Sequence, residues 1–452
     1  MCPPRRLRVP HTGHRTATKR SFIPSCGNHR RDGALLLWTV RANWQWSDLR
    51  RWWQNTVEFR RQVWNEHLAR LMTRGRAMDN TRRGLLPTMS TMVTAAGAAA
   101  TKDLANADKG DQARRAPPAQ DAIISTRLTR RLGIRHPIVC APMAFITGGA
   151  LAAAVTNAGG IGIVGGGFAG TLGILEPDLQ TELARVKSCK FGVGFITWAL
   201  ARAPKKLTTA LKYSPSCVFL SFGDPRPFAA EIQEAGAALI CQVQYLSQIP
   251  MALDAGAAAV VVQGTEAGGH GASRSTLAFV PEAADYLKQH SPNTLLLAAG
   301  GISDGRGLAA ALMLGADGVV AGTRLWASAE ALTPTAHTER AIGANGDETI
   351  RTKALDALRG IPWPREYSLR CLNNRLTSEW TDREGDAFGA FGSLATKYAE
   401  ARAHNDLDTV AVICGEGVGL IKDRPPAELI VKSMMSQAAD LLKHGANLTF
   451  GQ

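Results

Sequence analysis

The stretch that decides the fold is residues 295–324, which read LLLAAGGISDGRGLAAALMLGADGVVAGTR. A continuously apolar run at 295–299 leads into a glycine turn and then into an Ala/Leu-rich segment at 304–314. A second apolar run at 318–321 ends in a second glycine turn. Continuously apolar strands, as opposed to alternating ones, are typical of parallel strands that are covered on both faces. The stretch therefore predicts two strand–helix repeats of an α/β fold.

The same alternation of strand and helix extends outward from this stretch. We expect eight strands, at 137–141, 160–164, 191–195, 217–221, 238–243, 259–262, 295–299 and 318–321. Helices are expected after them, near 148–159, 171–188, 199–213, 226–236, 245–255, 280–290 and 304–314. Eight repeats predict closure into a (β/α)8 TIM barrel. The alternative is a doubly wound open sheet, which more often carries a GxGxxG turn after its first strand, and no such turn is present.

The repeat breaks after the eighth strand. Residues 335–408 are rich in helix formers and contain no further strand-like run, so they predict a helical lid inserted after strand eight. A short apolar run at 409–414 and an amphipathic segment at 426–444 then predict a return to the barrel with a delayed eighth helix. Trp363 and Trp380 could either line a pocket or pack the lid.

Residues 1–90 differ from the rest of the chain in composition. They hold 18 Lys and Arg against 5 Asp and Glu, so they account for 13 of the net charge of +14, and they hold six of the ten tryptophans. An Arg-rich, acid-poor start is typical of a mitochondrial transit peptide, although such peptides rarely carry this many tryptophans. We favour an over-extended start, with translation beginning at Met78 or Met89. A nucleic-acid-binding leader is a third interpretation, for which no recognisable module is present.

Composition also sets the expected domain organisation. Residues 91–124 are rich in Ala, Lys, Asp and Pro without periodicity, which predicts a flexible linker. The expected parts are a basic extension outside the fold (1–90), the linker (91–124), the barrel (125–334 plus 409–445) and the helical lid (335–408).

No stretch approaches the roughly 20 apolar residues of a membrane span. The eight cysteines form no CxxC pair, so no metal site is indicated. We therefore expect a soluble cytoplasmic protein, or a mitochondrial one if the extension is a genuine leader, that binds neither membranes nor nucleic acid.

Two glycine turns are candidates for an anion site. The active site of such a barrel lies at the C-terminal ends of its strands. Gly300 and Gly301 follow the seventh strand, and Gly322 and Thr323 follow the eighth. Glycines there allow backbone N–H groups to approach an anion closely, and these loops commonly hold phosphate in this fold. A single glycine turn could simply close a tight bend, but two on consecutive strands predict a phosphate site, for FMN or for a phosphorylated substrate.

His270 is the candidate catalytic residue. It lies after the sixth strand in the run QGTEAGGHGAS (263–273), where glycines on both sides let the loop lie against a planar ligand. Histidine exchanges a proton near neutral pH, as general base chemistry requires. A lone histidine is more often structural, but in this loop we expect catalysis. Structural or surface roles are expected for the other candidate histidines, which are His136, His290, His337, His404 and His444.

The ordered set of motifs resembles the nitronate monooxygenase family, formerly called 2-nitropropane dioxygenase. The resemblance covers about residues 125–445 and rests on PIVCAPM (137–143), AGGIGIV (158–164), FGVGF (191–195), EAGGH (266–270), AGGI (299–302) and GADGVVAGT (315–323). It implies non-covalent FMN, with His270 as the catalytic histidine. The FMN contacts it implies are Pro142, Met143, Ala144, Gly194, Gln242, Gly268 and Gly269, with the phosphate on Gly300, Gly301, Gly322 and Thr323.

Two residues depart from the pattern of the family. Many members have Asn where Gly194 stands and Lys where Gln242 stands. A cation near the flavin would stabilise its reduced, anionic form, whereas Gln242 can donate a hydrogen bond but carries no charge. The departures affect the expected redox tuning more than FMN binding itself.

The resemblance implies a reaction in which O2 oxidises an alkyl nitronate to a carbonyl compound and nitrite. His270 would orient the nitronate, or abstract the α-proton of a neutral nitroalkane.

The alternative is an FMN-dependent NAD(P)H enoyl reductase, since such enzymes share the barrel and a similar Gly-Gly-His loop. Inosine-monophosphate dehydrogenase shares the phosphate loops, but its reaction needs a nucleophilic Cys that residues 263–275 lack. A non-catalytic barrel that binds partners is a fourth interpretation. The physiological substrate, the use of NAD(P)H and the oligomeric state are left open by the sequence.

Overall fold

The computed structural model describes residues 123–168, 177–389 and 391–450. All of them belong to one of the two units into which the chain divides, Arg114–Gln452. The predictions for residues 1–90, for nearly all of the linker at 91–124, and for the first part of the helix at 171–188 lie outside the described residues.

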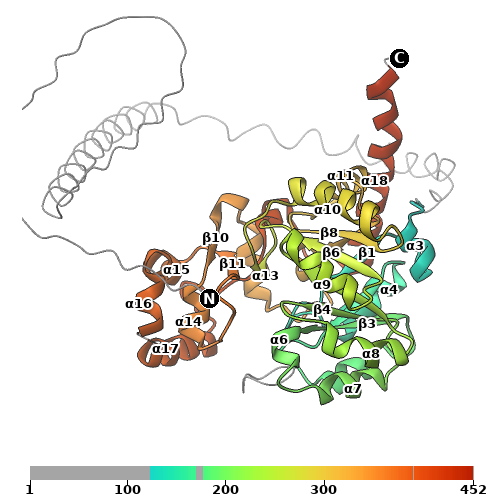
Figure 1. The fold of residues 1–452 in the computed structure, drawn as a ribbon. Helices are drawn as coiled ribbons and strands as arrows, with labels where there is room; N and C mark the ends of the chain where they lie inside the picture. Colours follow the sequence, from blue (N-terminus) through green and yellow to red (C-terminus); the bar gives the residue numbers. More distant parts are fainter. Residues whose placement is uncertain (1–122, 169–176, 390, 451–452) are drawn as a thin grey trace, which may run out of the picture. The chain divides into compact units, whose positions relative to one another are not determined.

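Eight parallel strands form the centre of this unit (Figure 1). Their order in the sheet is β1-β9-β8-β6-β5-β4-β3-β2. The bounds are β1 Ile138–Cys140, β2 Gly162–Gly165, β3 Phe191–Ile196, β4 Cys217–Ser221, β5 Ala238–Val243, β6 Ala259–Gln263, β8 Leu295–Ala299 and β9 Gly318–Ala321. Every predicted strand is confirmed, with small differences at the ends.

The two outer strands of this order come together and nearly close the sheet. Val139 in β1 forms a parallel bridge with Ile161, directly before β2. The N–H of Cys140 donates to the carbonyl of Ile161 over 2.9 Å, and the N–H of Ile161 donates to the carbonyl of Ile138 over 3.0 Å. The predicted TIM barrel is therefore confirmed.

Helices follow the strands along the chain, as the alternating texture predicted. Their bounds are α4 Gly149–Asn157, α5 Leu179–Ala184, α6 Thr197–Leu200, α7 Lys205–Leu211, α8 Arg226–Glu234, η2 Leu246–Gln248, α9 Ile249–Asp254, α10 Thr276–His290, α11 Gly305–Met313, α12 Thr323–Trp326 and α18 Ala427–Phe450. The delayed eighth helix is α18, which packs along α11.

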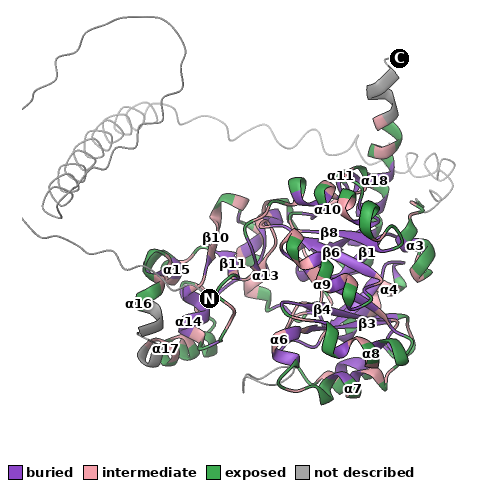
Figure 2. Cartoon of the chain, in the orientation of Figure 1, coloured by how far each residue is buried: buried purple, intermediate pink, exposed green. Residues whose placement is uncertain are grey.

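The barrel interior is closed at its N-terminal end. Figure 2 shows the strands as a buried layer, as expected for a sheet covered on both faces. Leu128 of α3 (Arg127–Leu132) belongs to the same apolar cluster as inward-facing strand residues such as Phe219 and Val261. It lies against Gly318, the first residue of β9, where an added Cβ would come within 2.4 Å of the Leu128 side chain. In the described part of the chain this end is filled, so a ligand site is expected at the opposite end of the barrel.

The insertion, residues 335–408, contains both helices and strands. Its helical elements are α13 Thr335–Ile342, η3 Gly346–Glu348, α14 Ala354–Arg359, α15 Arg375–Trp380, η4 Thr381–Arg383, α16 Glu384–Gly389 and α17 Phe391–Ala403, and η5 Glu416–Leu420 follows it. It also forms β10 Thr349–Thr352 and β11 Ser368–Leu372, which pair antiparallel. Here the expectation of no further strand was wrong, because both strands are short, β10 has Ile350 as its one apolar residue, and Arg370 interrupts the apolar run of β11.

The third strand of this small sheet comes from the barrel. β7 (Gly269–Gly271) lies in the loop after β6 and pairs antiparallel with β11, with His270 opposite Leu369. The loop that carries His270 is therefore held by the insertion through backbone pairing. None of the helices in the described part of the chain has the length and apolar character needed to cross a membrane.

Candidate active site

A cavity of about 510 Å³ lies at the C-terminal ends of the barrel strands. Its walls come from the barrel turns, from the loop that contains β7, and from the insertion. The structure brings every site residue predicted from the sequence to this cavity: Pro142, Met143, Ala144, Gly194, Gln242, Gly268, Gly269, His270, Gly300, Gly301, Gly322 and Thr323. The role of each of them toward a cofactor stays a prediction.

The turns after β8 and β9 present unused backbone donors. Among the described residues, no hydrogen bond within the protein uses the backbone N–H of Gly300, Gly301 or Gly322. Gly300 and Gly301 have φ angles of 108° and 71°, which favour glycine. A Cβ on Gly322 would meet no atom closer than 3.7 Å, so the space beside this turn is open. Free N–H groups around open space suit a phosphate group.

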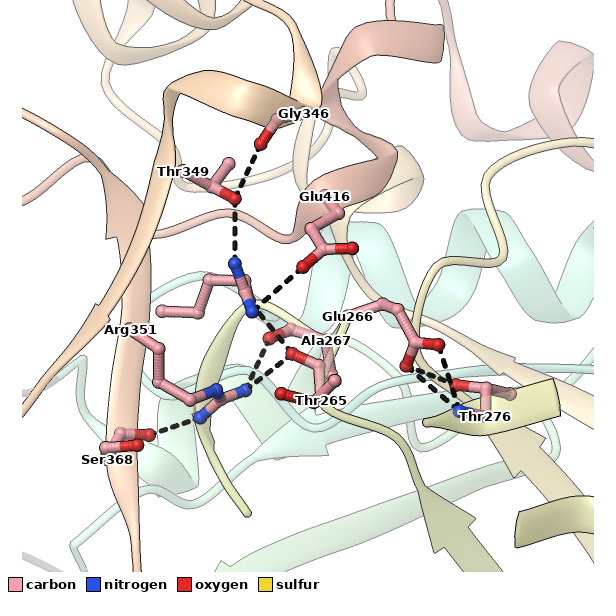
Figure 3. A network of polar contacts seen from close by, with 10 residues as sticks. Thr265, Glu266, Ala267, Thr276, Gly346, Thr349, Arg351, Ser368 and Glu416 are labelled. Atoms are coloured by element: carbon pink, nitrogen blue, oxygen red, sulfur yellow. Dashed lines mark hydrogen bonds and ion pairs between the residues drawn. The ribbon is translucent and has the colours of Figure 1, made fainter. Parts of the chain in front are cut away.

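Glu266 and Thr276 connect the loop after β6 to the turn after β8. The backbone N–H and the hydroxyl of Thr276 lie 2.9 Å and 2.7 Å from the carboxylate oxygens of Glu266 (Figure 3). The same hydroxyl lies 3.1 Å from the carbonyl oxygen of Gly300. The histidine loop and the predicted phosphate turn are therefore fastened to one another.

The opposite side of the cavity suits a broad, largely apolar ring. Gly194 lies within β3, and Pro142 packs so closely that an added Cβ would lie 2.3 Å from the Pro142 Cβ. Met143 and Ala144 continue this wall, and Gln242 at the end of β5 contributes a neutral amide. The residues present therefore fit a flavin: apolar contacts for a ring system, one uncharged donor beside it, and free amides for a phosphate.

His270 is held by two residues of the insertion. Its Nε2 lies 2.8 Å from Oδ2 of Asp356, and its ring stacks on Trp363 with centroids 3.5 Å apart and planes 12° apart. The side chains of His270 and Asp356 are only 8% and 4% exposed. Burial lowers the pKa of His270 below its usual 6.5, and Arg359 and Arg351 act in the same direction. Asp356 opposes this shift, but burial is the largest cause, so the imidazole is neutral at neutral pH.

The sequence analysis missed Asp356 and Arg359, and it had left two roles open for Trp363. Asp356 lies on α14 among buried apolar residues, and Arg359 lies three positions later at the cavity wall. His337, for which a structural or surface role was expected, also lines the cavity. A carboxylate inside the apolar run ALDALR was the one available signal for Asp356. Its partner, however, lies 86 positions earlier in the chain.

Two arginines, the partly buried Arg351 and the buried Arg370, fasten the insertion to the histidine loop. Figure 3 shows Arg351 of β10 between the carbonyl groups of Thr265 and Ala267 on one side and that of Ser368 on the other. Arg370 of β11 donates to the carbonyl of Thr265 over 2.9 Å and pairs with Glu416, also over 2.9 Å. These contacts cross between segments that are far apart in the sequence.

The fold and the site first define a class: a TIM-barrel oxidoreductase of the flavoenzyme type. The family model described as nitronate monooxygenase matches residues 125–193 and 192–437. The chain belongs to the nitronate monooxygenase family.

Individual relatives agree with this assignment. The chain is 35% identical to nitronate monooxygenase npaC of Metarhizium robertsii, over 68% of this chain and 91% of the relative. It is 32% identical to the nitronate monooxygenase of Neurospora crassa, over 68% of this chain and 90% of the relative.

Solved structures share the fold. FabK from Thermotoga maritima has a TM-score of 0.61 at 29% identity, over 72% of this chain and 99% of that one. A nitroalkane oxidase from Streptomyces ansochromogenes has a TM-score of 0.57 at 24% identity, over 70% of this chain and 99% of that one. At this identity, the second similarity shows the fold alone.

Proposed function

We propose that the protein binds FMN and oxidises alkyl nitronates with O2 to carbonyl compounds and nitrite. The observation that carries the proposal is the convergence on one cavity of a neutral, buried imidazole, free amide donors on the last two turns of the barrel, and an apolar wall. The membership in the nitronate monooxygenase family supports the same reaction class.

FMN would rest between the two sides of this cavity. Pro142, Met143 and Ala144 would contact its ring system, while the amides of Gly300, Gly301 and Gly322 would hold its phosphate. When bound, FMN supplies the acceptor for the electrons that leave the substrate. Gln242 would offer a hydrogen bond beside the ring without a charge.

His270 would handle the proton of the substrate. Because Nε2 is engaged by Asp356, Nδ1 is the nitrogen left to accept the α-proton of a nitroalkane or to contact a nitronate that binds already ionised. A neutral imidazole is the form that can take up this proton. The insertion and the barrel turns would keep bulk water away from the site.

Arg359 suits an anionic substrate. Its side chain lines the cavity, and no hydrogen bond or ion pair joins it to another described residue. An unpaired guanidinium attracts an anion and can bind two oxygens at once, as a nitronate presents them. We therefore propose Arg359 as the group that contacts the nitro oxygens.

The test combines a spectrum with turnover. The purified protein should retain flavin absorbance and consume O2 with production of nitrite when given a panel of alkyl nitronates. His270→Asn should lower turnover of neutral nitroalkanes by about 10²- to 10⁴-fold, the range of general base catalysis, and turnover of preformed nitronates much less. His404→Asn, an exposed position directly after α17, is the matched control. Wild-type-like turnover of both substrates by His270→Asn would remove His270 from both steps.

A second candidate is an FMN-dependent NAD(P)H enoyl reductase, favoured by the similarity to FabK. Anaerobic addition of NADH discriminates between the two. Rapid bleaching of the flavin together with absence of nitrite production in air would favour the reductase, whereas slow bleaching with nitrite production supports the nitronate reaction.

A further inference from the structure

Helix α14 of the insertion delivers a buried carboxylate to the candidate base. Asp356 lies in a run in which every residue from 354 to 358 is buried. Its Oδ2 lies 2.8 Å from Nε2 of His270, while its Oδ1 has no hydrogen-bond partner in the described part of the protein. Within the described part of the protein, the bond from Oδ2 to His270 is thus the one hydrogen bond of the Asp356 carboxylate.

A carboxylate in this setting is costly for stability. Removing a charge from water is unfavourable unless hydrogen bonds and an opposite charge replace the lost solvation, and here one oxygen is left without either. An apolar or amide side chain would fill the same space at a lower cost. A purely structural role therefore explains Asp356 poorly, and a role exerted through His270 explains it well.

Of the charged groups around His270, the carboxylate of Asp356 is the one that can stabilise a positive charge on the ring during proton transfer. The charged groups that act on the imidazole are Asp356 and Arg359 from α14 and Arg351 from β10. The two arginines disfavour an imidazolium, so Asp356 is the group among these three that favours it. Cys371 of β11 lies beside Asp356 but stays uncharged, because burial raises the pKa of its thiol to about 12.

We propose that Asp356 is a positioning residue for His270, which it holds with the proton on Nε2 so that the lone pair of Nδ1 is available to the substrate. The inference rests on the proposed function, in which His270 accepts the α-proton of a nitroalkane. In that step the C–H bond breaks, the proton moves to Nδ1, and the electron pair remains on the substrate as the nitronate. The carboxylate of Asp356 would offset the positive charge that forms on the ring.

Trp363 restrains the same ring from a second direction. Stacking at a centroid distance of 3.5 Å opposes tilting of the imidazole, while the hydrogen bond to Asp356 fixes its rotation in the plane. Both restraints come from residues 356–363 of the insertion. The insertion would therefore complete the catalytic site that the barrel begins.

The first test reads the tautomer directly in the wild-type protein and does not depend on turnover. In the flavin-loaded wild-type protein, ¹⁵N NMR of labelled histidine should show His270 protonated on Nε2 and unprotonated on Nδ1 at neutral pH. His270→Asn assigns the signal. A His270 signal that shows the proton on Nδ1 would overturn the proposal, whether or not nitronates are substrates.

The second test is a double-mutant cycle on nitroalkane turnover. Asp356→Asn should lower kcat/KM for a neutral nitroalkane by about 10²-fold and displace the acidic limb of its pH profile, with little effect on a preformed nitronate. In the His270→Asn background it should have almost no further effect, because the two side chains act as one unit. Asp347→Asn, an exposed carboxylate of the same insertion, is the control for the change of charge.

An equal loss from Asp356→Asn in both backgrounds would indicate a structural role and overturn the proposal. Retained flavin absorbance and an unchanged circular dichroism spectrum would show that the variant folds. If it does not fold, the NMR measurement on the wild type decides. Absence of nitroalkane and nitronate oxidation by the wild type would overturn the proposed function while leaving the tautomer result to decide the role of Asp356.

Discussion

Gly194 leaves no room for a side chain. With the Pro142 Cβ only 2.3 Å from the position of an added Cβ, no side chain fits on this residue of β3 unless the turn after β1 moves. Pro142 lines the cavity, so its position and the absence of a side chain at residue 194 are linked. A polar side chain at residue 194 cannot be accommodated in this arrangement.

Gly194→Ala should therefore destabilise the protein and weaken flavin retention. Overpacking of a close-packed site costs about 1–3 kcal/mol, which thermal unfolding followed by circular dichroism can measure. Gly343→Ala is the matched control, since its added Cβ would meet only one carbonyl oxygen at 4.0 Å. Equal stability of the two variants would contradict the steric explanation.

The buried imidazole of His270 predicts a pH dependence of stability. Its pKa in the folded protein lies below the usual 6.5, chiefly because of burial. Above pH 6.5 both the folded and the unfolded chain hold it neutral, so it contributes no slope there. As the pH falls through 6.5 the unfolded chain binds a proton that the folded one does not. The free energy of unfolding should therefore decrease, by up to about 1.4 kcal/mol per pH unit.

Urea denaturation between pH 8 and pH 5 measures this slope. His270→Asn should flatten the decrease below pH 6.5, while His404→Asn should keep the slope of the wild type. An identical slope in His270→Asn would mean that other groups cause the dependence.

At the scale of elements, the small sheet β10-β11-β7 determines where the histidine loop lies. Strand β7 has three residues and would not persist alone, since isolated short strands lack enough pairing. Backbone pairing with β11 and the carbonyl contacts of Arg351 supply the missing support. Burial and the neighbouring Arg370 lower the pKa of Arg351 to about 10, so it remains charged at neutral pH.

Arg351→Met keeps most of the apolar stem and removes the bonds to three carbonyl groups. Hydrogen bonds to a charged donor contribute about 1.5–3 kcal/mol each, so we expect a large local loss of order. Hydrogen–deuterium exchange should become faster at residues 265–271, and nitroalkane turnover should fall at least about 10-fold. Arg226→Met, which removes an exposed ion pair with Asp224 on α8, should leave both unchanged. Unaltered exchange at 265–271 in Arg351→Met would contradict this role of the insertion.

At the scale of the whole molecule, the barrel places its ligand site at one end and closes the other with α3. The turns after β8 and β9 are adjacent because β8 and β9 are neighbours in the sheet. A ligand that binds only the folded barrel stabilises it in proportion to the logarithm of its concentration.

Addition of FMN to the apoprotein should therefore raise the Tm in a concentration-dependent manner. At 100 times the Kd, the stabilisation should be about 2.7 kcal/mol. Riboflavin has the same ring without the phosphate, so it serves as the matched control and should stabilise much less at equal concentration. Equal shifts for the two flavins would show that the turns after β8 and β9 do not hold a phosphate.

The sequence by itself determined the barrel and the part of the candidate site that the barrel contributes. It did not determine the residues of the insertion that contact His270. Eight apolar strand runs, the helices between them, the glycine turns and His270 were all predictable, because each depends on a local pattern that reports burial or backbone freedom. The wrong expectation of a strand-free insertion arose where this local pattern is weak. Strands β10 and β11 are short, carry arginines, and exist by pairing with each other and with β7.

Only the tertiary structure decided what surrounds His270. Asp356, Trp363 and Arg351 reach the histidine loop from a segment more than 80 positions later in the chain, as the 86-residue separation of His270 and Asp356 illustrates. Contacts of this kind depend on where the chain returns after the insertion, and a local pattern carries no information about that return. A buried carboxylate in an apolar helix signals only that some partner exists, and the fold decides that the partner is His270.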